Sequence, residues 1–314
     1  GKKMTVCQLY AKQMRHRGNV RYNTKNGRKR LMKLLEEDKL GGCPIDSVKL
    51  SDAKEWAIRM KEKGISYKTI SNDKRSLKAA FYTAIQDDCI RKNPFDFQLN
   101  TVIEDDTEPK VPLTPAQEES FLSFAQNDKV YQKYYDELII LLGTGLRISE
   151  LCGLTDTDIN FENRIINVDH QLLRSAETGY YIETPKTKSG IRQIPMSEKV
   201  YEAFNRVLKR RRGAKAVTID GYSNFLFLNR DGYPKTATNY DGMFRGLAKK
   251  YNKYHEEALP KVMTPHTLRH TFCTNMANAG MNPKALQYIM GHSNITMTLN
   301  YYAHATFDSA KAEM

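Results

Sequence analysis

The sequence predicts a mainly α-helical protein that carries a small antiparallel β-sheet and is divided into two domains. Three features of its 314 residues predict this fold class. Apolar residues recur at helical spacing through the first hundred positions, an aperiodic stretch with closely spaced acids follows, and strand-like alternation appears between residues 164 and 196. We therefore expect a helical domain at residues 1–100, a linker at 101–112 and a mixed α+β domain at 113–314.

The first domain is expected to consist of four helices. Their apolar residues recur at three- and four-residue intervals, and Gly64 marks the end of the third helix. The expected segments are 5–14, 23–40, 49–64 and 66–88. In the fourth segment, Ile70, Leu77 and Phe81 share one face, so this helix has an apolar side for a core.

Positive charge is concentrated in the first domain. Residues 1–100 hold 23 Lys and Arg against 11 Asp and Glu, whereas residues 101–314 hold 26 against 25. Lys74, Arg75 and Lys78 fall away from the apolar face of the fourth helix. Such an excess indicates a polyanionic partner, because each cation that neutralises a phosphate releases condensed counterions. A solvated surface is the alternative interpretation.

The second domain begins with a helix signal at Thr114. This residue suits the N-cap, Pro115 suits the first helical position, and Gln117 completes a capping box. The elements expected after this helix are two helices around a Gly-rich break in 134–154, strands in 164–173, 179–196 and 224–229, and helices in 264–280, 282–291 and 294–314.

Several classes of protein are excluded by composition. The longest apolar run, "LIILL", is too short to span a bilayer, and the opening "GKKMTVCQLY" lacks the apolar region of a signal peptide. The five cysteines are scattered and form no CxxC pair, which argues against a disulfide framework and a thiolate zinc site. We expect a soluble intracellular protein.

Polar residues suited to chemistry occur in four separated fragments of the second domain. The fragments are "GTGLRISEL" with Arg147, "TPKTKSGIRQIPM" with Lys186 and Lys188, "TPHTLRHTF" with His266, Arg269 and His270, and "MGHSNITMTLNYYAHA" with His292, Tyr301 and Tyr302. Each alone has another explanation. The first resembles the turn of a helix-turn-helix, and His266 and His270 have metal-ligand spacing without the glutamate of an HExxH motif.

In this order and combination, the fragments resemble the tyrosine recombinase (integrase) family, most closely the integrases of conjugative transposons and temperate phages. "HTLRHTFCT" followed by "LQYIMGHSNITMTLNYYAH" is the most specific part of the resemblance. The resemblance covers most of the chain. It implies a two-domain DNA clamp, in which a helical core-binding domain is joined to a mixed α+β catalytic domain. The DNA contacts that we expect in the first domain are Lys68, Lys74, Arg75 and Lys78.

The resemblance also implies a reaction. A tyrosine attacks a DNA phosphodiester and leaves a 3'-phosphotyrosyl link and a free 5'-hydroxyl. Because the covalent link retains the energy of the broken bond, no nucleotide cofactor is required, and we expect no metal. The implied roles are phosphate clamping by Arg147 and Arg269, hydrogen bonding to phosphoryl oxygens by His266 and His292, and protonation of the leaving oxygen by Lys186. Lys188 is the alternative to Lys186.

Two adjacent tyrosines compete for the role of nucleophile. In the family this tyrosine commonly precedes a histidine by two residues, and only Tyr302 satisfies that pattern, with His304. Related members place the tyrosine one residue nearer the Gly-His pair, which selects Tyr301. Tyr302 is the preferred nucleophile on sequence, and Tyr301 is its rival.

The implied function is site-specific recombination that integrates or excises a mobile element. The implied partner is double-stranded DNA, bound by a dimer at each site and by a tetramer in synapsis, with no membrane involved. The implied location is the bacterial cytoplasm, in association with the nucleoid. The alternatives are a non-catalytic helical DNA-binding regulator, a type IB topoisomerase-like enzyme, and a metal-dependent hydrolase that uses His266, His270 and Cys273.

Overall fold

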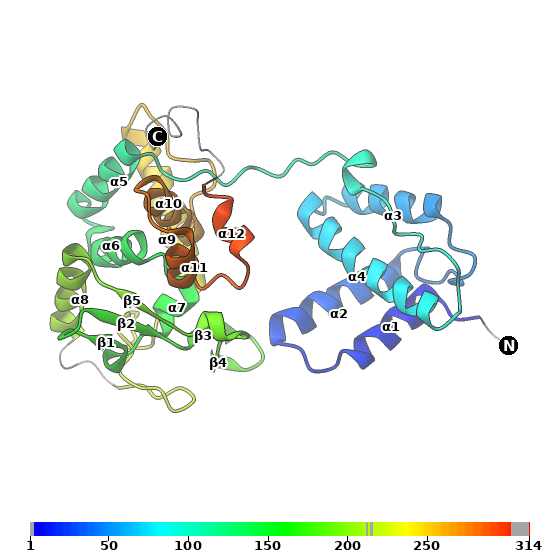
Figure 1. Cartoon of the computed structure of the whole chain (residues 1–314), viewed down its shortest axis with the longest axis horizontal. Coiled ribbons are helices and arrows are strands. Elements are labelled where there is room, and N and C mark those ends of the chain that lie inside the picture. Colours follow the sequence, from blue (N-terminus) through cyan, green and yellow to red (C-terminus); the bar gives the residue numbers. More distant parts are fainter. Residues whose placement is uncertain (1–2, 212, 214–215, 303–313) are drawn as a thin grey trace. The chain divides into compact units, whose positions relative to one another are not determined.

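The computed structural model describes residues 3–211, 213, 216–302 and 314. The chain forms two compact units, an N-terminal unit (Gly1–Pro109) and a C-terminal unit (Lys110–Met314), and the division between them falls inside the stretch expected to be a linker. Most elements are helices, and the strands form small antiparallel sheets (Figure 1). The predicted fold class is therefore confirmed, although two small sheets replace the single sheet that was expected.

The N-terminal unit is a bundle of helices around one apolar core. Its α-helices in the described residues are α1 (Val6–His16), α2 (Tyr22–Glu37), α3 (Leu50–Glu62) and α4 (Tyr67–Gln86), followed by the short η1 (Leu99–Thr101) (Figure 1). Thr5 and Ser66 cap α1 and α4, because their hydroxyls accept from backbone N–H groups three residues later. The fully buried rings of Trp56 and Phe81 both pack on Phe95, at centroid distances of 5.7 and 5.4 Å.

The expected basic residues of this unit all lie on α4, in different surroundings. Arg75 and Lys68 are exposed. The ammonium of Lys78 is 2.5 Å from the Asp96 carboxylate, and that of Lys74 lies 4.5 Å from the centre of the Phe97 ring. Two of the four basic residues, Lys74 and Lys78, therefore already interact with other side chains of the N-terminal unit.

The C-terminal unit contains further helices. They are α5 (Pro115–Asn127), η2 (Gln132–Tyr134), α6 (Tyr135–Thr144), α7 (Ile148–Gly153), η3 (Asp156–Asp158), η4 (Lys188–Gly190), α8 (Glu198–Arg211), α9 (Ala237–Tyr254), α10 (Pro265–Asn278), α11 (Pro283–Met290) and α12 (Ile295–Leu299). Helix α5 begins with the expected capping box, in which Thr114 and Gln117 exchange hydrogen bonds. Helices α8 and α9 were not predicted from the sequence, although the residues of α8 that face the core, Val200, Phe204 and Val207, have helical spacing.

Two antiparallel sheets lie in the middle of this unit's sequence. One has the order β1 (Ile159–Asn160), β2 (Ile165–Val168), β5 (Arg192–Pro195), and the other pairs β3 (Gln171–Ser175) with β4 (Gly179–Glu183). The strand expected at 224–229 is wrong, because those residues form only isolated bridges.

Near its C-terminus the chain departs from the single long helix that the sequence predicts for 294–314. Helix α12 ends at Leu299 and is followed by a turn, while His304 lies outside the described residues. Among the helices that are described, none has the length and apolar character needed to cross a membrane.

Candidate active site

Arg147 stands at the turn between α6 and α7. Gly145 ends α6 with φ of +66°, and a Cβ there would lie 2.4 Å from a ring carbon of Phe272, so both conformation and space require glycine. Arg147 follows as the N-cap of α7. Its backbone N–H donates to Glu150 Oε2 at 2.9 Å and its Nη1 to Glu150 Oε1 at 2.8 Å, while Nη2 donates to the Gly291 carbonyl at 3.1 Å. The side chain remains 38% exposed, so a ligand can reach it.

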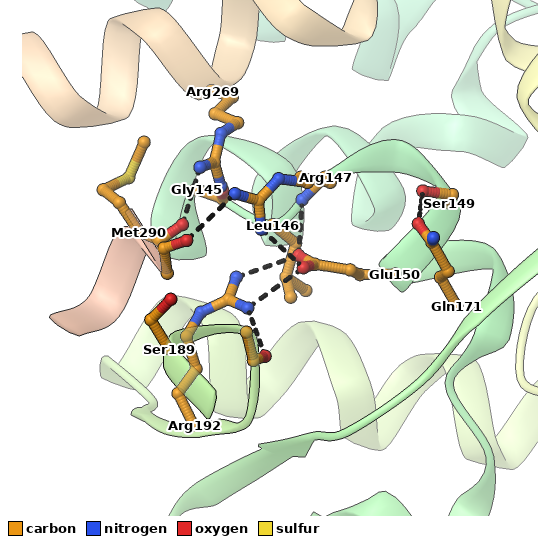
Figure 2. A network of polar contacts seen from close by, with 12 residues as sticks. Gly145, Leu146, Arg147, Ser149, Glu150, Gln171, Ser189, Arg192, Arg269 and Met290 are labelled. Atoms are coloured by element: carbon orange, nitrogen blue, oxygen red, sulfur yellow. Dashed lines mark hydrogen bonds and ion pairs between the residues drawn. The ribbon is translucent and has the colours of Figure 1, made fainter. Parts of the chain in front are cut away.

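Arg269 reaches the same turn from α10. Its guanidinium donates to the carbonyl oxygens of Gly145 and Met290, and the residue is 5% exposed (Figure 2). Burial, and secondly the positive charge of Arg147, lower the pKa of Arg269 to about 9. Two guanidinium groups therefore lie close together at one point, an arrangement that favours an incoming anion.

Arg192 is a member of this cluster that was not predicted from the sequence. From β5, its Nη1 and Nη2 donate to the two carboxylate oxygens of Glu150 at 3.0 and 2.9 Å (Figure 2). Burial alone raises the pKa of Glu150, but the hydrogen bonds from Arg192 and the charges of Arg192 and Arg147 lower it to about 2. A signal was present in "IRQIPM", because strand alternation places Arg192 on the same buried face as Ile194 and Met196.

His292 follows α11, directly after the Met290 and Gly291 carbonyls that accept from Arg269 and Arg147. Gly291 ends that helix with φ of +63°, and the Nδ1 of His292 lies 2.9 Å from the hydroxyl of Thr298. Burial, followed by the charges of Arg269 and Arg147, lowers the pKa of His292 to about 4. The imidazole is therefore neutral at physiological pH.

His266 lies in the first turn of α10 and is exposed, unlike Arg269 one turn further along the helix. A positive charge on His266 would also lower the pKa of His292, so the two histidines lie near each other. The structure therefore brings Arg147, Arg269, His266 and His292 to one locality, from three fragments that are distant in the sequence.

Lys186 and Lys188 are both exposed, on the segment between β4 and β5. Lys188 begins η4, which ends at Gly190, and the Gly190 carbonyl accepts from Arg192 Nη1 at 3.1 Å. The segment that carries the lysines is thus tied to the arginine cluster through its last residue.

Tyr301 and Tyr302 have different surroundings. The Tyr301 ring meets the His270 ring edge-on, with centroids 5.0 Å apart. Burial raises the pKa of Tyr301, while the nearby charge of Arg269 acts in the opposite direction. The hydroxyl of Tyr302 instead donates to the Met281 carbonyl. Tyr302, the tyrosine preferred on sequence, is therefore hydrogen-bonded to the backbone ahead of α11, and its rival Tyr301 is the one near Arg269.

The residues of the hydrolase alternative do not form a metal site in the part of the chain that the structure describes. The group there with suitable ligand spacing is Asp158, Asp169 and His170. Both ring nitrogens of His170 are occupied, by Asp169 and by the Gly153 carbonyl, each at 2.6 Å. This arrangement is explained by hydrogen bonding alone.

Comparisons with known proteins identify the family to which the chain belongs. Residues 112–309 match the phage integrase family. The chain is 69% identical over all 314 residues to the transposase from transposon Tn916 of Enterococcus faecalis and to the transposase from transposon Tn1545 of Streptococcus pneumoniae, and it covers 77% of each.

Solved structures give the same result. The Tn1549 transposon integrase, in complex with a circular intermediate DNA, is 78% identical, with a TM-score of 0.95 and 99% of both chains covered. A lambda integrase dimer bound to a core site is 14% identical, with a TM-score of 0.63 and 95% of both chains covered, and shares the fold. This chain belongs to the phage integrase family.

Proposed function

We propose that this protein is a site-specific DNA recombinase that moves a mobile element by cutting and rejoining DNA strands through a 3'-phosphotyrosyl intermediate. The observation that carries the proposal is the convergence of Arg147 and Arg269 on the Met290–Gly291 carbonyls directly before His292, with Tyr301 near Arg269. The similarity to transposases of Tn916 and Tn1545, and to a transposon integrase solved with DNA, supports this function.

The two arginines would hold the scissile phosphate. Attack on phosphorus builds negative charge on the non-bridging oxygens, and planar guanidinium groups match those oxygens with paired N–H donors. Arg147 is partly exposed, so a phosphate can reach it, whereas Arg269 is buried behind it and anchored to two carbonyls. Because Arg269 is already held in place, its positive charge can stabilise the transition state without any movement of the side chain.

The nucleophile that we propose is Tyr301, in place of the Tyr302 favoured by the Tyr-x-His pattern. Structures of the Tn1549 integrase carry an arginine-to-lysine substitution at position 225 and a tyrosine-to-phenylalanine substitution at position 379 of that protein. Those positions differ by 154, as do Arg147 and Tyr301 here, whereas Tyr302 is 155 residues from Arg147. The engagement of the Tyr302 hydroxyl with Met281, and the proximity of Tyr301 to Arg269, favour the same choice.

The remaining roles concern protons. His292 is neutral and hydrogen-bonded to Thr298, which suits donation of an N–H to a phosphoryl oxygen, and His266 is exposed at the start of α10, where it can accept the tyrosine proton. We assign protonation of the leaving 5'-oxygen to Lys186, on the exposed segment ahead of η4, with Lys188 as the alternative.

The N-terminal unit would bind the DNA around the cleavage site. We propose phosphate contacts by Lys68, Lys74, Arg75 and Lys78, and a protein that acts as a dimer on each site and as a tetramer in synapsis. Because its relatives belong to bacterial transposons, we place its action on DNA in the bacterial cytoplasm.

The test is a nicked "suicide" duplex that carries the element's end. The protein should form a covalent protein–DNA band on a denaturing gel, because the short fragment released by cleavage diffuses away and rejoining fails. DNA binding without this band would instead identify a non-catalytic regulator. Transfer of the bound strand to a second duplex would distinguish recombination from a topoisomerase-like activity, which relaxes supercoils without exchanging partners.

A further inference from the structure

One buried side chain joins three of the four fragments of the active site. Arg192 donates to Glu150 on α7 through two nitrogens, to the Ile289 carbonyl on α11 through Nε at 2.6 Å, and to the Gly190 carbonyl at the end of η4. Its side chain is 0% exposed. It therefore acts on DNA only through the groups that it holds.

Glu150 transmits this connection to Arg147. Its two carboxylate oxygens accept from Arg192 and also from the Nη1 and backbone N–H of Arg147 (Figure 2). One carboxylate thus orients two guanidinium groups and offsets their mutual repulsion. With its pKa lowered to about 2, Glu150 keeps its charge throughout the working range of pH.

The backbone around the Arg192 guanidinium is shaped to admit it. A Cβ at Gly291 would lie 3.0 Å from Nη1 and 3.1 Å from the carbonyl oxygen of Ser189. Gly291 directly precedes His292, and its carbonyl also accepts from Arg147. The turn that carries His292 and the segment that carries the two lysines therefore both lie against the Arg192 side chain.

We propose that Arg192 is a positioning residue for strand cleavage, which orients Arg147 through Glu150 and aligns it with the His292 turn and the lysine-bearing segment. This inference rests on the proposed function. The planar fork of an arginine is required, because a lysine carries the same charge but cannot donate two parallel hydrogen bonds to a carboxylate and a third to a carbonyl.

The test compares cleavage of the suicide duplex with DNA affinity and thermal stability, using full-length protein. In Arg192→Met the single-turnover cleavage rate at saturating protein should fall about 100-fold, because a small misplacement of the phosphate clamp has that effect, while DNA affinity stays close to wild type. Arg192→Lys should remain well below wild type, since it retains the charge without the fork.

Two further variants separate positioning from folding. Arg192→Met leaves the buried Glu150 charge with only Arg147 as its ion-pair partner, so the double variant Glu150→Gln/Arg192→Met should recover melting temperature but not the cleavage rate. Arg59→Met breaks a matched pair in the N-terminal unit, where Arg59 donates to both oxygens of Asp38 at 2.8 Å. It should lower the melting temperature and leave cleavage at saturating protein unchanged.

The outcomes are distinct. Wild-type cleavage by Arg192→Met or Arg192→Lys, or a double variant that regains stability and cleavage together, would overturn the positioning role. If the wild-type protein forms no covalent band under the same conditions, the proposed function fails, and not this inference alone.

Discussion

The phenol ring of Tyr301 stands edge-on to the imidazole ring of His270, with centroids 5.0 Å apart and planes inclined at 66°. Because His270 directly follows Arg269 on α10, this contact holds the Tyr301 ring beside the helix that supplies one of the two arginines proposed to bind the phosphate. The neighbouring Tyr302 packs on the same apolar cluster, but its hydroxyl donates to the Met281 carbonyl.

Substituting the two tyrosines in turn should therefore give unequal results. Tyr301→Phe should abolish the covalent adduct on the suicide duplex while leaving DNA binding intact, because it removes only the attacking oxygen. Tyr302→Phe should retain the adduct and lose about 1 kcal/mol of stability, the typical net contribution of one hydrogen bond. Loss of the adduct in Tyr302→Phe alone would restore the choice made from the Tyr-x-His pattern.

Alanine at Gly291 should impair both stability and cleavage. The substitution places a side chain in the left-handed region, at a cost of roughly 1–2 kcal/mol, and presses its Cβ against Arg192. Gly280→Ala is the matched control, because Gly280 has φ of +80° but open space around its Cβ position. Denaturant unfolding should show that both variants lose stability, whereas only Gly291→Ala should lower the cleavage rate. Equal cleavage by the two variants would contradict the crowding argument.

Releasing Lys78 from its ion pair should strengthen DNA binding. In Asp96→Asn the ammonium of Lys78 loses its internal partner and becomes available to a phosphate, so the slope of log K against log salt should steepen by about 0.9. Asp87→Asn removes a charge of the same sign from the pair with Lys12 and serves as the control. Arg75→Ala should change the slope by a similar amount in the opposite direction. Identical slopes for the two aspartate variants would place Lys78 away from the DNA.

Stability should fall on acidification in two successive ranges. His292 has a pKa of about 4 in the folded protein against 6.5 ordinarily, so the unfolded chain takes up its proton first, and stability present above pH 6.5 is lost between 6.5 and 4. Glu150, at about 2 against 4.5, contributes stability above pH 4.5 that is lost as the pH falls toward 2. In His292→Gln, the free energy of unfolding measured with urea should depend less steeply on pH between 4 and 6.5. An unchanged slope there would exclude His292 as its source.

A chelator should leave cleavage unchanged. The proposed chemistry neutralises the phosphate with Arg147 and Arg269, so the yield of covalent adduct with EDTA should equal that without it. Chelator-sensitive cleavage that added magnesium or zinc restores would instead favour the hydrolase alternative.

Local patterns in the sequence determined much of this protein. Helical periodicity and capping residues predicted α1 to α5, α10 and α11, because each depends on contacts within a few residues along the chain. The four polar fragments identified the family, and the comparisons confirmed it.

Tertiary structure decided what depends on distant contacts. Glu150 and Arg192 are 42 residues apart, and Arg192 and Ile289 are 97 apart, so no local pattern reveals that one buried arginine joins those segments. The surroundings of the two tyrosines differ for the same reason. In the helix that the sequence predicts, Tyr301 and Tyr302 would point about 100° apart, which does not say what each one contacts. Only the packing of α10 and of the chain ahead of α11 places Arg269 near Tyr301 and the Met281 carbonyl against Tyr302.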